Sequence, residues 1–169
     1  MNVVYDPYIV FFVRWLHVTS GVMWIGLLWY FNFVQIPSMP KIPDDQKPAV
    51  TKVIAPTALF WFRWAALSTV VWGLIQAAQL HYLKSALSLG YLAHSPHDMR
   101  IGIGMWFGLL MAFNVWFIIW PNQKKALGIV TVPAEEKAKA ARMAMLTSRF
   151  NTMLSIPMLY LMVGASHAG

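Results

Sequence analysis

Long apolar segments constrain this chain more than any other feature of its sequence. Four segments, at about residues 8–36, 57–82, 101–120 and 144–164, are mostly apolar. Each has about the 20 residues that a helix needs to cross the hydrocarbon core of a bilayer. Backbone polar groups in lipid must be satisfied within the segment, which favours helices. The predicted fold is all-α: residues 1–169 form a single domain, an integral membrane four-helix bundle.

The composition agrees with this prediction. Only 11% of the residues are charged, against about a quarter in an ordinary soluble domain. The first apolar segment is too long for a signal peptide and no basic region precedes it, so we expect a retained helix. The sequence has no cysteine, which excludes thiolate metal sites and covalently attached haem c.

The basic residues predict the orientation of the bundle. Eight lie in or beside the first and third connections, namely Lys41, Lys47, Lys52, Lys124, Lys125, Lys137, Lys139 and Arg142. Three lie on the other side, namely Arg14, Lys84 and Arg100. Because the more basic side stays in the cytoplasm, both termini are predicted to be periplasmic in a multi-pass protein of the bacterial inner membrane. This topology accounts for the net charge of +7 without a nucleic-acid partner.

All five histidines lie at or near the predicted periplasmic side, namely His17, His81, His94, His97 and His167. His17 is inside the first apolar segment, where an ionisable group is costly and usually functional. Arg14 and Gly21 share its helical stripe. A glycine one turn from a histidine lets a flat macrocycle approach the helix, and Arg14 suits a propionate. The alternative is a neutral, hydrogen-bonded His17 with glycines that serve helix packing.

These observations predict one or two non-covalent haem b groups. The candidate iron ligands are His17, His81 and His167, with two imidazoles from different helices on one iron. A weaker alternative is a copper or zinc site in the loop that contains His94 and His97.

A second polar cluster is predicted near the cytoplasmic side, formed by Arg63, Asn114, Arg149 and Asn151. It suits an anionic ligand, such as the propionates of a second haem, a quinone head group or an anionic substrate. Helix-to-helix hydrogen bonds and snorkelling arginines are the alternative interpretation. All six acidic residues lie outside the apolar segments, which disfavours a proton-coupled transporter.

Several stretches resemble a known family: RWLHVTSGVMWIGLLWYFNFVQIP, FWFRWAA, FNVWFIIWPNQKK and SRFNTMLSIPMLYLMVGASH. They look like the membrane domain of bacterial cytochrome c-coupled urate oxidases (urate hydroxylases). Members that oxidise urate have further membrane helices and a C-terminal cytochrome c domain. A chain without cysteine resembles a short form that lacks this domain, so the resemblance implies a periplasmic C-terminus but not urate chemistry. A second resemblance, to haem-binding membrane proteins of the protoporphyrinogen oxidase type, also implies haem.

The function that we expect is a haem b-binding electron-transfer protein of the membrane, or a subunit of a respiratory complex. Its partner would be a periplasmic cytochrome c or a larger respiratory complex, and the lipid-facing surface is compatible with a homo-oligomer. One alternative is a urate-oxidase-like membrane oxidoreductase that works with a separate cytochrome c. Another is a cofactor-free accessory subunit, so the sequence leaves open whether the chain is an enzyme.

Overall fold

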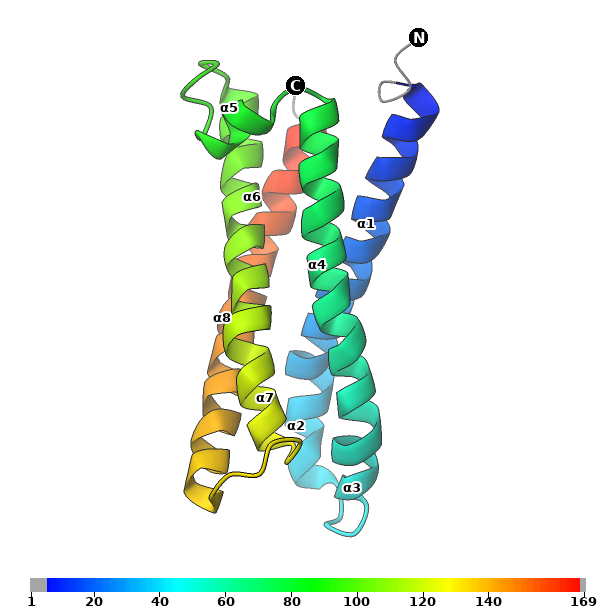
Figure 1. Cartoon of the computed structure of the whole chain (residues 1–169), viewed down its shortest axis with the longest axis vertical. Coiled ribbons are helices and arrows are strands. Elements are labelled where there is room, and N and C mark those ends of the chain that lie inside the picture. The colour runs from blue at the N-terminus through cyan, green and yellow to red at the C-terminus, as the bar shows by residue number, and fades with distance from the viewer. Residues whose placement is uncertain (1–5, 168–169) are drawn as a thin grey trace.

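The structure is a computed structural model that describes residues 6–167, with residues 166 and 167 described by their backbone alone. Four long helices run side by side, and the described residues contain no strand (Figure 1). The prediction of an all-α fold is therefore confirmed. We call the end where α1 begins and α8 ends the upper end, and the opposite end the lower end.

Three of the long helices are interrupted by π-helical segments. The first consists of α1 (Pro7–Trp29), a π-helical segment (Tyr30–Gln35), α2 (Ile36–Ser38) and a 3-10 turn (Met39–Lys41). The second consists of α3 (Lys47–Ala49), a π-helical segment (Val50–Ile54) and α4 (Ala55–Gln79). The third consists of α6 (Pro96–Phe113), a π-helical segment (Asn114–Ile119) and α7 (Trp120–Ala126). A short α5 (Leu83–Leu87) precedes α6, and the fourth long helix is α8 (Ala134–His167).

Each π-helical segment ends two residues before a proline, and these prolines are Pro37, Pro56 and Pro121. A proline has no N–H, and its ring collides with the carbonyl four residues earlier in a regular α-helix. The wider π-helical turn, in which an N–H binds the carbonyl five residues back, makes room for that ring. Before Pro121, for example, the Trp120 N–H binds the Val115 carbonyl.

This arrangement corrects the predicted helix ends. The predicted end of the third helix at about residue 120, directly before Pro121, is wrong, since the helix continues to Ala126. The first helix extends past residue 36 to Lys41 for the same reason. The second helix ends at Gln79 instead of residue 82, because His81 adopts a left-handed conformation with φ of 61°.

Three helices are long and apolar enough to cross a membrane: Pro7–Lys41, Lys47–Gln79 and Pro96–Ala126. The fourth long helix, α8, is not among them. It begins with Glu135 and Glu136, contains Pro157, and buries a row of polar side chains. Those side chains are Ser148, Asn151, Thr152 and Ser155, and they face the other helices instead of the surroundings.

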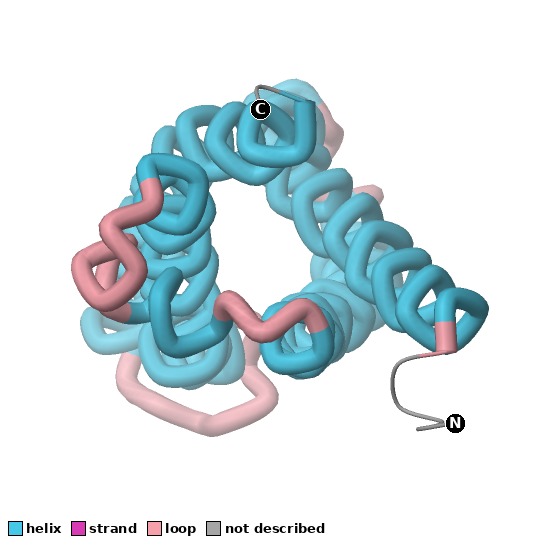
Figure 2. Tube along the Cα trace, turned by 90° about the horizontal axis from the view of Figure 1, so that it is seen from above, coloured by secondary structure: helices cyan, strands magenta, loops and turns pink. Residues whose placement is uncertain are grey.

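The core lies in the middle and lower parts of the four long helices. Trp24, Leu28, Phe62, Met111 and Val115 are almost completely buried there. α1 packs along α4, and α6 packs along α8. Toward the upper end α1 leans away from α8, so the tops of these two helices stand apart in both views (Figures 1 and 2).

Candidate functional site

A cavity of about 660 Å³ lies in the upper half of the protein, between α1, α4, α6 and α8. We call it the upper cavity. Its volume lies within the range of about 300–1,000 Å³ that is usual for cofactor and ligand sites. The walls are mostly apolar, and the polar or ionisable side chains in its lining are Arg14, His17, Trp24, Trp29, Thr69, Gln76 and Tyr82. Such a wall, with few polar groups, is typical of a site for a large and mainly apolar ligand.

His17 is a partly buried ionisable group of this cavity, and its orientation is fixed by α4. The Nδ1 atom of His17 lies 2.8 Å from the backbone carbonyl oxygen of Thr69. Because a carbonyl only accepts, Nδ1 donates its hydrogen and Nε2 keeps its lone pair. A histidine that binds a metal through one nitrogen usually donates from the other to a carbonyl or carboxylate in this way. The imidazole of His17 is thus held in the tautomer that a metal needs.

Gly73 leaves the space in which this imidazole lies. A Cβ atom at position 73 would lie 2.8 Å from Cε1 and 2.9 Å from Nδ1 of His17, closer than real side chains approach. Thr69 and Gly73 are one turn apart on α4 and therefore present the same face. The ring of His17 fits against α4 only because residue 73 has no side chain.

Two further glycines leave open space in the cavity wall. Gly26 on α1 and Gly108 on α6 both line the cavity. A Cβ atom added at either position would meet nothing within 4 Å. At these two points no side chain covers the helix backbone on the cavity side, which would allow a flat ligand to approach it.

Unpartnered polar atoms also point to a ligand. Among the described residues, Trp24 Nε1 and Gln76 Oε1 are buried side-chain atoms without a hydrogen-bond partner, and both residues line the upper cavity. Trp24 is only 1% exposed. A buried donor or acceptor without a partner costs about 1–3 kcal/mol, which a ligand or a bound water would recover.

Arg14 and Tyr82 lie at the upper edge of the cavity. Arg14 is exposed, and Tyr82 belongs to the turn between α4 and α5. Burial raises the pKa of the Tyr82 hydroxyl, and the positive charge of Arg14 opposes this shift. The two side chains are therefore close enough to interact, and together they offer a positive charge and a neutral hydroxyl at the edge of the cavity.

The other histidines of the described part lie outside this cavity lining. His81 is exposed. His94 Nδ1 lies 2.9 Å from the Tyr91 carbonyl oxygen, and His97 Nδ1 lies 3.0 Å from Asp98 Oδ1. His167 is the last residue of α8, and its side chain lies outside the described residues. Within the described part, no group of three or more His, Asp or Glu side chains could hold a metal ion.

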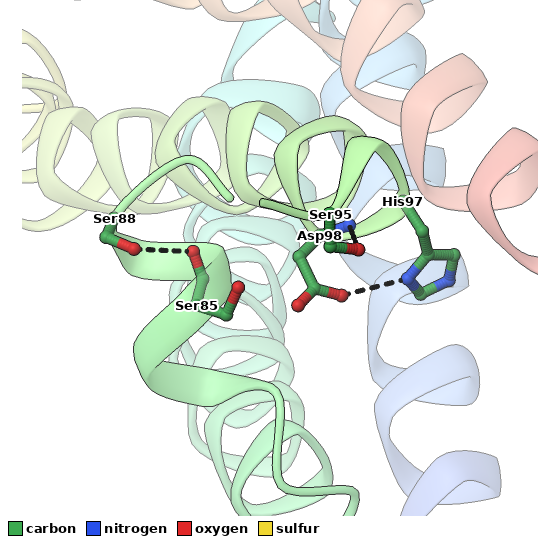
Figure 3. Close-up of polar contacts among 5 residues, drawn as sticks. All are labelled: Ser85, Ser88, Ser95, His97 and Asp98. Atoms are coloured by element: carbon green, nitrogen blue, oxygen red, sulfur yellow. Dashed lines mark hydrogen bonds and ion pairs between the residues drawn. The ribbon is translucent and has the colours of Figure 1, made fainter. Parts of the chain in front are cut away.

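His97 lies in the first turn of α6, and not in the preceding loop in which the sequence predicts it. Ser95 Oγ accepts a hydrogen bond of 3.2 Å from the Asp98 N–H, which caps the helix, and the Asp98 carboxylate in turn faces His97 (Figure 3). Ser88 donates to the Ser85 carbonyl in the neighbouring α5.

The lower polar cluster predicted from the sequence is only partly brought together. Asn114 Nδ2 donates to Asn151 Oδ1 at 2.8 Å, and Asn151 Nδ2 donates to the Met111 carbonyl at 3.0 Å. Both asparagines are buried, with 5% and 0% exposed. Arg63 instead lies over the ring of Trp120, with its guanidinium carbon 3.9 Å from the ring centroid. Arg149 is exposed.

A second, smaller cavity of about 170 Å³ lies in the lower half. We call it the lower cavity. Its polar lining residues are Gln35, Thr51, Gln123 and Ser148, all neutral, and the four residues predicted for the lower cluster are not part of its lining. The sequence does not point to either glutamine of this lining: Gln35 is a neutral residue near the end of the first apolar segment, and Gln123 follows the predicted end of the third.

Residues 92–169 match the family model described as "Urate oxidase N-terminal". This match supports a relation of the second half of the chain to that urate-oxidase-related N-terminal family. None of the curated proteins and none of the solved structures compared with the chain matches it.

The family match covers one wall of the upper cavity. It includes α6 and α8, which contribute Met105, Met158 and Met162 to the lining. The opposite wall, formed by α1 and α4 with His17 and Gly73, precedes the matched region. The features that make His17 a candidate ligand therefore rest on the structure alone.

Proposed function

We propose that this chain is a four-helix protein of the bacterial inner membrane that binds haem b in the upper cavity through His17 and transfers electrons. The observation that carries the proposal is the geometry of His17. Its Nδ1 atom is engaged by the Thr69 carbonyl, its ring lies against Gly73, and it lines a cavity of about 660 Å³.

The surface of the protein supports a membrane location. Large apolar side chains are exposed along the long helices, for example Tyr160 with 77%, Met153 with 72% and Val22 with 69% of their area accessible. Such a surface is unfavourable in water but suits lipid. From Ser148 onward α8 buries four polar side chains and exposes large apolar ones such as Met153, Ile156 and Tyr160, and Arg149 is the exposed charged residue of this part. We therefore propose that this part of α8 spans the bilayer as the fourth helix, despite the lower overall apolarity of α8.

The basic residues support an orientation with the upper end in the periplasm. Lys41, Lys47 and Lys52 lie around the lower connection between α2 and α3, and Lys124 and Lys125 lie at the lower end of α7. The positive side stays in the cytoplasm. Both ends of the chain and the upper cavity would then face the periplasm, where a cytochrome c or a larger respiratory complex could exchange electrons with the site.

The residues present fit a haem. The His17 imidazole supplies a nitrogen ligand, and its hydrogen bond to Thr69 raises the basicity of that nitrogen. Bare backbone at Gly26 and Gly108 allows the approach of a macrocycle, and Arg14 at the upper edge offsets carboxylate charge. A haem iron supplies one-electron chemistry, and the apolar lining would limit access of water to it. One such group fits the upper cavity, whereas the lower cavity is about four times smaller.

The test is the haem content of the purified full-length protein and of a His17→Ala variant. We expect the wild type to show the split bands of a reduced b-type cytochrome. The variant should insert into the membrane normally but lose at least about nine-tenths of its haem, because a methyl group cannot replace an iron ligand. His94→Ala is the matched control, since His94 is exposed in the loop and should keep full haem content.

A wild-type protein that never contains haem would refute the proposal and leave a cofactor-free accessory subunit. Full haem content in the His17→Ala variant would refute the assignment of the site.

The family match favours a second candidate, a membrane oxidoreductase related to urate oxidases that works with a separate cytochrome c. Its test is the consumption of urate by the purified protein in the presence of oxidised cytochrome c. Reduction of cytochrome c that depends on urate would favour this enzyme, and reduction that proceeds only from another donor would favour simple electron transfer.

A further inference from the structure

The wall of the upper cavity opposite His17 offers sulfur as a ligand atom. His17 is on α1, and the helices across the cavity, α6 and α8, contribute three methionines: Met105, Met158 and Met162. Apart from His17, the described lining residues include no imidazole and no carboxylate. Thioether sulfur is an established axial ligand of haem iron, and it binds opposite histidine in many cytochromes.

Two contacts between α1 and α8 show which α8 residues lie at the level of His17. Trp29 donates to Ser155 and Asn32 donates to Ser148, so paired residue numbers in these antiparallel helices sum to 184 and 180. Because both helices rise by about 1.5 Å per residue, the same sums hold along their length to within about a turn. His17 then lies opposite residues 163–167, whereas Met158 lies opposite residues 22–26.

Met162 is the cavity-lining methionine of α8 nearest to that level. Its Cγ and Cε atoms lie 3.4 Å and 3.3 Å from the position that a Cβ on Gly104 would occupy. The side chain therefore lies in the seam between α8 and α6, at the cavity wall. Met158 is a buried member of the central core that contains Trp24, whereas Met162 is only partly buried and packs at the edge of that core. Met105 packs on the cluster of Ala86, Ile101 and Ala165.

We propose that the thioether sulfur of Met162 is the second axial ligand of a haem whose first ligand is His17. The inference rests on the proposed function, because it needs a haem in the upper cavity. The two ligands of the iron would then be one imidazole and one thioether, in place of the two imidazoles that the sequence predicts. Ligation by histidine and methionine gives a higher reduction potential than ligation by two histidines, so the site would act at the oxidising end of an electron-transfer chain.

The experiment uses the full-length protein with its haem and measures the spin state of the ferric iron, its near-infrared charge-transfer spectrum and its reduction potential. We expect a low-spin wild type with the signature of sulfur ligation. Met162→Leu should keep its haem through His17 but lose the low-spin signal. Met162→His should keep a low-spin iron, lose the sulfur signature and have a lower potential than the wild type.

Met105→Leu and Met158→Leu are the matched controls, since both residues line the same cavity, and each should keep the wild-type spectrum. Gly104→Ala is a milder variant that leaves the ligand in place. Its added methyl group would press on Met162, so the sulfur signature should weaken while the protein still folds.

Failure of the inference can be distinguished from failure of the proposed function. A wild type with haem and two imidazole ligands, or a His167→Ala variant that loses the low-spin signal while Met162→Leu keeps it, would overturn the role of Met162 alone. A wild type without haem would overturn both.

Discussion

The two halves of the bundle differ in the hydrogen bonds between their helices and in the volume of their cavities. In the lower half, neutral side chains on neighbouring helices are joined by hydrogen bonds, as between Asn114 and Asn151 and between Asn32 and Ser148, and the cavity is only about 170 Å³. In the upper half, the cavity is about 660 Å³, and Gly26 and Gly108 in its lining leave space unfilled. The lower half fixes how the helices pack, so the upper half can remain open for a ligand.

The largest effect that this comparison predicts comes from filling the space that Gly73 leaves for the ring of His17. In Gly73→Ala the new Cβ would lie 2.8 Å from the imidazole, so the ring of His17 or the helix must shift, which disturbs the hydrogen bond between His17 and Thr69. We expect haem affinity to fall at least about tenfold, in line with the usual effect of losing an outer-shell partner of a metal ligand. The measurement is haem titration into the purified apoprotein, monitored by absorbance.

Gly164→Ala is the control for this variant, because a Cβ on Gly164 meets nothing within 4 Å and Gly164 does not line the cavity. It should bind haem as the wild type does. Equal haem affinity in Gly73→Ala and the wild type would show that the contact between His17 and α4 does not matter for binding.

The sequence predicts the features of the site that depend on local properties, and it does not predict those that depend on contacts between helices. The helices and the importance of His17 follow from apolar segments and from the cost of an ionisable group in them, both of which are local properties. The partners of His17 on α4 depend on the register of two helices, and no local pattern fixes that register. Gly73 is an example, since it lies 56 positions after His17 in the sequence and yet lies against the ring of His17 in the structure.

The helix ends show a second limit. Prolines usually end helices, and the third predicted segment ends at about residue 120, directly before Pro121. Here a π-helical segment before the proline lets the helix continue. The sequence also predicts that Arg63 and Arg149 belong to one polar cluster, because both lie near the predicted cytoplasmic side. The ring of Trp120 provides Arg63 with a neighbour that depth alone does not reveal.

A smaller effect is expected from breaking the hydrogen bonds of the lower half. Asn151→Leu leaves Asn114 Nδ2 and the Met111 carbonyl without their partner in the core. Hydrogen bonds between membrane helices contribute about 0.6 kcal/mol on average and up to about 1.7, so we expect a loss of about 1–2 kcal/mol in the free energy of unfolding. Reversible unfolding in mixed micelles measures this loss, and the haem spectrum should not change.

The double variant Asn114→Leu/Asn151→Leu sharpens the test. Removing both partners leaves fewer unpaired groups than removing one, so the double variant should be less destabilised than the sum of the two single variants. A changed haem spectrum in Asn151→Leu would contradict the separation of the two halves.

The smallest effect concerns two arginines that carry the same charge in different halves. Arg14 lines the upper cavity, whereas Arg63 lies over the ring of Trp120, which α7 carries in the lower half. A positive charge near a haem stabilises the reduced state, which is the more negative one, so Arg14→Gln should lower the reduction potential. The shift should be modest and should shrink as salt is added, because Arg14 is exposed and its charge is screened.

Arg63→Gln should leave the potential unchanged and cost about 0.5–1 kcal/mol of stability through its lost contact with Trp120. Redox titration of both variants at two salt concentrations measures the difference. An equal shift in the two variants would mean that the charge of the lower half also reaches the site, and that the two halves are not electrostatically separate.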